Sequence, residues 1–160
     1  MELKIVPMTE EFAAEIQRWR YDGLYAFYNR REEFWAENIP AMLDGSHIAF
    51  LEPSGRLAGY FSFGEDGRIP TVEECVYDAS ALDIGLGLRP DLCGQGNGLA
   101  FVKEGIHYAE ETLGGKRLRL SVAAFNERAI RVYQRAGFQI ERQVTNSYFK
   151  NLFYIMVREP

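Results

Sequence analysis

The sequence predicts an α/β (α+β) fold with a mixed, mostly antiparallel central sheet, one parallel strand–helix–strand crossover, and helices on both faces. Three observations lead to this prediction. Two apolar runs flank the turn "EPSGR", which is typical of a hairpin. A strand, a glycine-rich loop, a helix and a second strand then follow over residues 81–122, the order of a right-handed parallel crossover. Two further apolar runs close the chain as antiparallel neighbours.

In the first half of the chain, apolar runs and turn residues alternate. Proline ends the run "LKIVP", and Thr9 precedes a segment with the helical apolar spacing Phe12, Ile16 and Trp19. The predicted elements are a strand at 3–7, a helix at 10–20, a helix at 32–45 that Pro40 interrupts and Gly45 ends, and hairpin strands at 48–51 and 57–63. The segment 65–80 is polar and receives no assignment.

In the second half, the periodicity is clearer. Residues 81–88 alternate, with leucine and isoleucine on one face and Asp83, Gly85 and Gly87 on the other. The apolar residues from Leu99 to Leu113 recur at spacings of three and four, which predicts a helix after the glycine loop. The remaining predicted elements are a strand at 116–123, a helix at 127–136 capped by Asn126 and ended by Gly137, and strands at 138–144 and 147–157.

Composition restricts the class of protein. A chain of 160 residues with 47% hydrophobic and 26% charged residues predicts one globular domain over residues 1–160. The net charge of −5 opposes nucleic acid as a partner, and no apolar stretch reaches membrane-spanning length. The start "MELKIVPMTEEF" does not resemble a signal peptide, so we expect a cytoplasmic protein, a monomer or homodimer. The spacing of its two cysteines and two histidines predicts no metal site.

The loop "CGQGNG" places glycines at 94, 96 and 98, immediately before the best predicted helix. It lacks the lysine and hydroxyl residue of a P-loop, and its GxGxG spacing differs from the GxGxxG of dinucleotide-binding folds. Unpaired amides at a helix N-terminus attract anions, and glycines let a diphosphate approach the backbone. From the glycines alone, a diphosphate cradle and a tight packing turn are equally good interpretations.

The loop resembles the acetyl-CoA-binding loop of the GNAT superfamily of N-acetyltransferases. That family's signature is Gln or Arg, two residues, Gly, one residue, then Gly or Ala, which aligns Gly96 and Gly98 with the signature glycines. Cys93 stands where the family usually has Gln or Arg. Downstream, "LRLSVAAFNERAIRVYQRAGF" resembles the family's strand–Asn–helix segment, and the matching residues are Asn126, Ala129, Tyr133, Gly137 and Phe138.

The resemblance implies transfer of an acetyl group from acetyl-CoA to a primary amine, by direct attack and without an acyl-enzyme. Tyr133 matches the family's general acid, which protonates the departing sulfur. The resemblance implies that the pantetheine arm of CoA pairs with the backbone of Leu86 and Leu88, and that Asn126 makes a further polar contact to CoA. It also implies that the diphosphate of CoA contacts the loop residues Cys93, Gly94, Gln95, Gly96, Asn97 and Gly98. The acceptor that the resemblance implies is a small-molecule amine, or the N-terminal or lysine amine of a peptide or protein.

The acceptor amine must lose a proton before it attacks. Some family members use a strand carboxylate, and Asp83 lies near one such position, whereas another is occupied here by Ser121. We therefore predict Asp83 as the general base; the alternatives are a carboxylate that only orients the substrate ammonium and a buried, hydrogen-bonded aspartate. The resemblance implies that the aromatic segment that includes Trp19, Tyr21 and Tyr25 lines the acceptor pocket, where aromatic faces would attract an ammonium group; the alternative is packing in the core. The alternative function is a non-catalytic acyl-CoA-binding regulatory module.

Overall fold

The chain alternates between two compact units in the structure, a computed structural model that describes residues 2–160. Unit 1 contains the residues up to Ser62 together with Leu86–Asn97, and unit 2 contains Phe63–Gly85 and Gly98–Pro160. The strand order is β1-β2-β3-β4-β5-β7-β6, and strands β3 and β4 contribute residues to both units. One strand pair, β4–β5, is parallel. These observations confirm the predicted mixed, mostly antiparallel sheet.

Unit 1 is built on the predicted hairpin. Its elements are β1 (Lys4–Pro7), α1 (Glu10–Arg18), two short 3-10 helices at Gly23–Tyr28 and Glu32–Phe34, α2 (Trp35–Ala41), β2 (His47–Leu51) and β3 (Leu57–Phe63). Strands β1, β2 and β3 pair antiparallel, and Gly55 turns the hairpin with a φ of 90°. The second predicted helix is shorter than expected: it begins as a 3-10 turn and ends at Ala41, one residue after Pro40.

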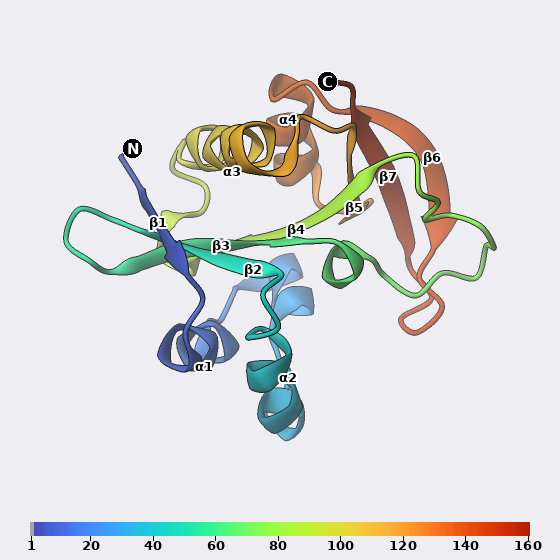
Figure 1. The fold of residues 1–160 in the computed structure, drawn as a ribbon. Helices are drawn as coiled ribbons and strands as arrows, with labels where there is room; N and C mark the ends of the chain where they lie inside the picture. Colours follow the sequence, from blue (N-terminus) through green and yellow to red (C-terminus); the bar gives the residue numbers. More distant parts are fainter. Residues whose placement is uncertain (1) are drawn as a thin grey trace. The chain divides into compact units, whose positions relative to one another are not determined.

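Helices α1 and α2 lie on the same side of the three strands of unit 1 (Figure 1). Thr9 caps α1 by accepting a hydrogen bond from the Phe12 amide at 3.1 Å, as its position predicts. The apolar face of α1 packs against α2 and the hairpin in a core of Ala13, Ile16, Trp19, Met42, Ala49 and Leu57. This core fixes the segment after α1, which carries the predicted acceptor residues.

Unit 2 contains the predicted crossover. Its elements are the first half of β4 (Leu82–Leu88), α3 (Gly98–Leu113), β5 (Leu118–Ala123), α4 (Glu127–Arg135), β6 (Gln139–Thr145) and β7 (Leu152–Arg158). The parallel register pairs Leu82 with Leu118 and Ile84 with Leu120, and β7 lies between β5 and β6, antiparallel to both.

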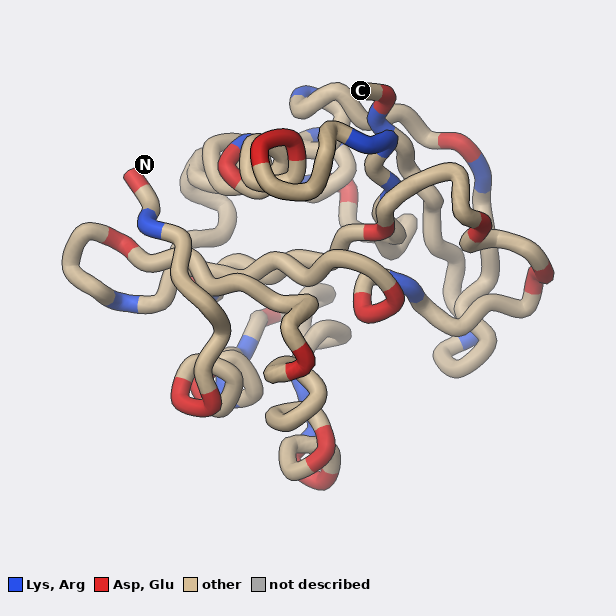
Figure 2. The backbone as a smooth tube through the Cα atoms, in the orientation of Figure 1, with Lys and Arg blue, Asp and Glu red and all other residues tan. Residues whose placement is uncertain are grey.

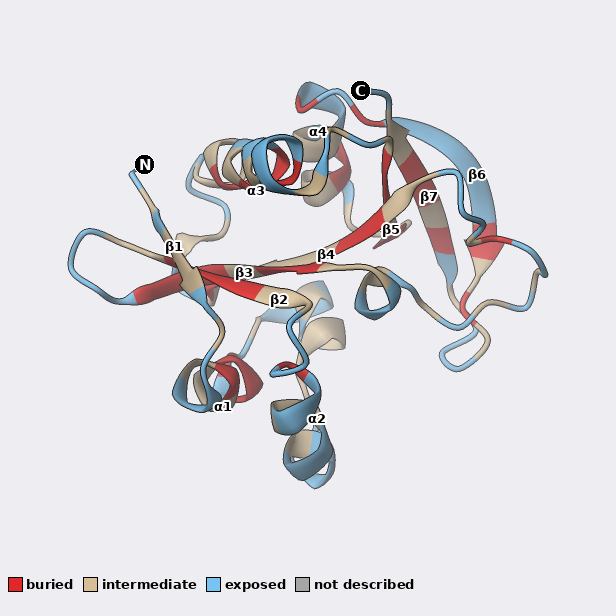
Figure 3. Cartoon of the chain, in the orientation of Figure 1, coloured by how far each residue is buried: buried red, intermediate tan, exposed pale blue. Residues whose placement is uncertain are grey.

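The two helices of unit 2 pack side by side, with their buried faces toward the strands (Figure 3). Gly98 opens α3 beside Val132 of α4, and an added Cβ would lie 3.4 Å from a Val132 methyl group. Among residues 2–160, no helix is both long and apolar enough to cross a membrane.

Candidate active site

The glycine loop between β4 and α3 has backbone amides without hydrogen-bond acceptors in residues 2 to 160. Gly94 and Gly96 have positive φ values of 71° and 82°, which glycine adopts at low cost. In the part of the chain that the structure describes, the backbone amides of residues 94–97 donate no hydrogen bond. Residues 94–96 are exposed, and residues 92–97 carry no acidic or basic side chain (Figure 2). The loop therefore presents consecutive unpaired donors directly before the 16-residue helix α3.

The side chains of this loop brace the loop itself. Gln95 Nε2 donates to the Asp91 carbonyl at 2.9 Å, and Asn97 Nδ2 donates to the Leu92 carbonyl at 3.1 Å. The Cys93 thiol lies 3.6 Å from the carbonyl oxygens of Leu88 and Arg89. These contacts hold the loop in shape without using its backbone amides, so the departure of Cys93 from the family's Gln or Arg leaves those main-chain donors in place.

The last residues of β4 have a defined backbone orientation. The Arg89 amide donates to the Ala58 carbonyl of β3 at 2.8 Å. Because amides on one edge of a strand belong to alternate residues, the backbone groups of Leu86 and Leu88 point away from β3. Arg89 itself is buried, and its guanidinium pairs with Glu52 at 2.7 Å and Asp91 at 2.6 Å. This ion pair ties the end of β4 to the β2–β3 hairpin.

Tyr21 contacts β4 directly. Its hydroxyl donates to the Leu88 carbonyl at 2.7 Å, and burial raises its pKa, so the hydroxyl remains a proton donor. The strand thus occupies the polar end of Tyr21, so an acceptor contact would have to come from its half-buried ring, and the acceptor-binding role of Tyr21 stays a prediction.

Trp19 does not fit the predicted acceptor pocket. It is 7% exposed and belongs to the core of unit 1, with its ring 6.4 Å from that of Tyr60. A tryptophan with so little exposed surface packs the core rather than lining a pocket. Tyr25 is half-buried in the 3-10 helix Gly23–Tyr28, and its acceptor-binding role stays a prediction.

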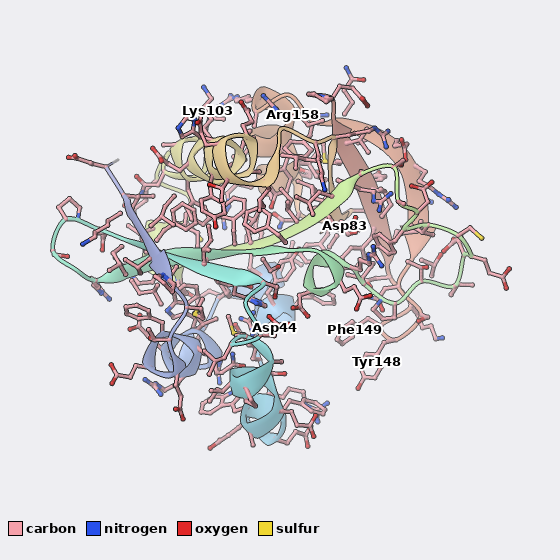
Figure 4. The ribbon with its side chains drawn as sticks, viewed as in Figure 1. Asp44, Asp83, Lys103, Tyr148, Phe149 and Arg158 are labelled. Atoms are coloured by element: carbon pink, nitrogen blue, oxygen red, sulfur yellow. The ribbon has the colours of Figure 1, made fainter. Side chains whose placement is uncertain are left out.

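Asp83 lies in a buried ion-pair network of unit 2 (Figure 4). Arg119 Nε and Nη2 donate to its two carboxylate oxygens at 2.6 and 2.9 Å, and Arg68 Nε donates to Oδ2 at 2.8 Å. Both carboxylate oxygens of Asp83 therefore already accept charge-assisted hydrogen bonds, and the side chain is buried away from any acceptor amine in solution. The predicted role of Asp83 as general base therefore does not fit, and the alternative of a buried, hydrogen-bonded aspartate describes it.

The Ser121 hydroxyl is hydrogen-bonded to Tyr77, a residue that the sequence patterns did not identify. The Tyr77 hydroxyl and Ser121 Oγ lie 2.6 Å apart, and the guanidinium carbons of Arg68 and Arg119 lie 5.6 and 5.4 Å from the Tyr77 ring centroid. Burial raises the pKa of Tyr77, which keeps the phenol protonated. Neither hydroxyl is a base for an ammonium group.

The strand–Asn–helix segment folds as predicted. Asn126 Oδ1 accepts a hydrogen bond from the Ala129 amide at 3.2 Å and so caps α4. Tyr133 lies two turns further along this helix, half-buried, and its ring packs edge-on against Phe138 at 6.2 Å between centroids. Gly137 ends the segment with a φ of 100°. The motif thus fixes the Tyr133 ring from both its helix and the following turn.

One side chain near β4 was missed by sequence reasoning. Arg30 donates to the Tyr60 hydroxyl at 2.8 Å, and the Tyr60 ring leaves no space for a side chain at Gly87. Gly87 was a visible signal, because a glycine inside a strand often marks a close approach. Arg30 follows a short aromatic helix and had no periodicity to distinguish it.

Comparison with known proteins agrees with this architecture. The model of the acetyltransferase (GNAT) family matches residues 10–138. The chain therefore belongs to the acetyltransferase (GNAT) family, which confirms the resemblance, and it is an acetyl-CoA-dependent acyltransferase. A search of curated proteins finds no match by sequence.

Solved structures resemble the chain over almost its whole length. A spermidine N-acetyltransferase chimera of SpeG from Vibrio cholerae and hSSAT has a TM-score of 0.74 at 15% identity, covering 99% of this chain and 96% of that one. AAC(6')-Ib in complex with paromomycin and acetyl-CoA has a TM-score of 0.74 at 20% identity, covering 99% and 94%. The aminoglycoside acetyltransferase AAC(6')-Ib with coenzyme A has a TM-score of 0.73 at 20% identity, covering 99% and 95%. At these identities the likeness shows the fold.

Proposed function

We propose that residues 1–160 act as one acetyltransferase domain, a monomer or homodimer, in which a primary amine attacks the thioester carbonyl of acetyl-CoA. The amine nitrogen forms a bond to the acetyl carbon, the carbon–sulfur bond breaks, and CoA leaves. The acceptor is a small-molecule amine or an N-terminal or lysine amine of a peptide. The observation that carries the proposal is the series of unpaired backbone amides at residues 94–97, followed by helix α3.

The glycine loop is the proposed diphosphate site. Unpaired amides and the positive end of the helix dipole both favour a dianion. Since the side chains of Gln95 and Asn97 hydrogen-bond within the loop, the contacts from Cys93 to Gly98 are main-chain contacts. A diphosphate held this way needs no lysine or arginine from the loop.

The pantetheine arm is proposed to pair with the backbone of Leu86 and Leu88. Their amides and carbonyls point away from β3, as the Arg89–Ala58 hydrogen bond requires. The Leu88 carbonyl already accepts from Tyr21, so the Leu88 amide is the better partner for a pantetheine carbonyl. Asn126, which caps α4, is proposed as a further polar contact to CoA.

Tyr133 is the proposed general acid for the departing sulfur. A thiol has a pKa near ~8.5 and a tyrosine near ~10, so the thiolate can leave without help and proton transfer from tyrosine is slightly uphill. General acid catalysis therefore accelerates the step without being indispensable to it.

The acceptor proton is proposed to pass to water. An alkylammonium with a pKa near ~10.4 is neutral in only about one molecule in 2,500 at pH 7. Asp83, Ser121 and Tyr77 are unsuited to remove the proton, for the reasons given above. The reaction rate should therefore rise with pH as the fraction of neutral amine rises.

Two measurements test this function. Acetyl-CoA should raise the melting temperature, whereas ATP and NAD should not. CoA release should then be followed across a panel of amines that includes spermidine and an aminoglycoside, the acceptors named for the similar structures. Stabilisation by ATP alone would contradict the proposal. Acetyl-CoA binding without turnover of any amine would favour the non-catalytic module, which neither the family nor the solved structures support.

A further inference from the structure

Arg30 is a half-buried cation without an anionic partner. Its Nη2 donates to the Tyr60 hydroxyl at 2.8 Å, and its guanidinium carbon lies 5.6 Å from the centroid of that ring. Within residues 2–160, no carboxylate forms an ion pair with Arg30, and Tyr60 is the sole hydrogen-bond acceptor of its side chain. A guanidinium has five N–H donors, so most of those of Arg30 remain available.

The other arginines at similar or greater depth are paired. Arg89 contacts Glu52 and Asp91, and Arg119 contacts Asp78 and Asp83. Removing a charge from water is costly unless an opposite charge or several hydrogen bonds compensate it. Arg30 is thus an exception within the same chain, and its missing partner points to a bound anion.

Arg30 is connected to the proposed pantetheine strand through one side chain. Tyr60 of β3 accepts its hydrogen bond, and the Tyr60 ring packs so closely on Gly87 that a Cβ there would overlap Cε1. The next residue, Leu88, receives the Tyr21 hydroxyl. All of these residues belong to unit 1, so this cluster is defined within a single unit.

The Arg30 backbone is also fixed. Its carbonyl accepts a hydrogen bond from Trp35 Nε1 at 3.2 Å. The neighbouring Tyr60 hydroxyl raises the pKa of Arg30, which keeps the guanidinium charged. A charged, anchored guanidinium is well suited to a planar oxyanion, because it can present two parallel N–H donors to it.

We propose that Arg30 binds the carboxylate of the acceptor, and that the acceptor class is an amine that carries a carboxylate. This inference rests on the proposed acetyl transfer and adds the substrate class to it. The carboxylate pairs with the free N–H groups of Arg30, while the amine of the same molecule attacks the acetyl group. A purely cationic polyamine gains nothing from Arg30 and is repelled by it.

The test uses amino acids with increasing spacing between amine and carboxylate, each compared with its primary amide. In the wild-type protein, kcat/KM for at least one acid should exceed that for its amide by tenfold or more. Arg30→Gln should reduce this acid-to-amide ratio by about ten- to a hundredfold, the range expected for a charged hydrogen-bonded pair. Arg31→Gln is the matched control, because Arg31 is exposed and paired with Glu33.

Tyr60→Phe gives a second readout. It leaves the charge of Arg30 in place but removes its hydrogen-bond acceptor, so KM for the acid should rise with little change in kcat. The melting temperature of each variant shows whether it is folded. If Arg30→Gln does not fold, the acid-to-amide ratio of kcat/KM is compared between the wild-type protein, Tyr60→Phe and Arg30→Lys instead.

Three outcomes would overturn the inference, and they differ from one another. Equal turnover of acids and amides by the wild-type protein would exclude a carboxylate site while acetyl transfer to amines stands. Loss of acetyl-CoA affinity in Arg30→Gln, measured by calorimetry, would instead assign Arg30 to a CoA phosphate. Absence of turnover with every amine, despite acetyl-CoA binding, would remove the proposed function together with the inference.

Discussion

Asp83 and Arg119 face each other as register partners across the parallel pair β4–β5, and two N–H donors of Arg119 meet the two carboxylate oxygens of Asp83 at 2.6 and 2.9 Å. Both side chains are buried, and Arg68 adds a third donor. Within unit 2, this pair joins the two strands of the crossover by charge as well as by backbone hydrogen bonds. It makes Asp83 a structural residue.

Asp83→Asn should therefore reduce stability more than it reduces chemistry. The substitution leaves two guanidinium groups beside a neutral amide, and breaking a buried pair typically costs about 3–5 kcal/mol. Urea unfolding measures this loss, with the exposed Glu111→Gln as a control for the change in charge. Activity per folded molecule should keep its normal pH profile. A stable but inactive Asp83→Asn protein would restore Asp83 as the base.

Tyr133→Phe should lower kcat without weakening acetyl-CoA binding. The change removes the hydroxyl proposed to protonate the sulfur and keeps the ring that packs on Phe138. The loss should fall within the roughly 10² to 10⁴ range of general acid catalysis, toward its lower end because a thiolate leaves readily. Steady-state kinetics measures it, and Tyr148→Phe, at an exposed tyrosine, is the control. Unchanged activity would exclude Tyr133 as the acid.

Gly96→Ala should weaken acetyl-CoA binding. Gly96 has a φ of 82° and no atom near its would-be Cβ, so alanine causes backbone strain of about 1–2 kcal/mol and distorts the amide cradle. Gly55→Ala is a matched control, because Gly55 has a φ of 90°, equal space and a position in the β2–β3 turn. Calorimetric titration with acetyl-CoA should distinguish them. Equal affinities for the two variants would argue against the cradle.

Asp78 should make folding dependent on pH in acid. Hydrogen bonds from the Ser80 hydroxyl and amide, and from Arg119, lower its pKa from 3.8 to about 2. Because the folded state holds the proton less tightly than the unfolded state, Asp78 stabilises the fold above about pH 4. That contribution is lost as the pH falls toward 2. The stability difference between wild type and Asp78→Asn should shrink over this window, and a difference independent of pH would refute the assignment.

Much of the fold was predictable from local patterns. The apolar spacing of α3, the cap at Asn126 and the β2–β3 hairpin depend on residues close in sequence, and each formed as expected. The parallel register, which sets Asp83 opposite Arg119, depends on how two distant strands align. No sequence pattern specifies that alignment, so the pairing of Asp83 with Arg119 could not be predicted. The general-base prediction for Asp83 therefore depended on its position in the family's strand alone.

The candidate site likewise contains parts that local sequence motifs predict and parts that depend on contacts between distant residues. Its loop and the Tyr133 helix follow from contiguous motifs, whereas Arg30 and Tyr60 meet only through the folding of unit 1. Trp19 was predicted to line a pocket, but it packs the core of unit 1 instead. The sequence shows that aromatic residues lie close together along the chain, but it does not show which of their side chains are exposed to solvent.

Direct acetyl transfer is tested most directly by a reaction of purified protein with acetyl-CoA and a panel of amines, read by mass spectrometry of the acceptor together with CoA release. We expect one acetyl group on the amine for each CoA released, with a rate that rises with pH as the amine becomes neutral. Release of CoA without an acetylated amine, or a stable acetyl group on the protein itself, would contradict direct transfer.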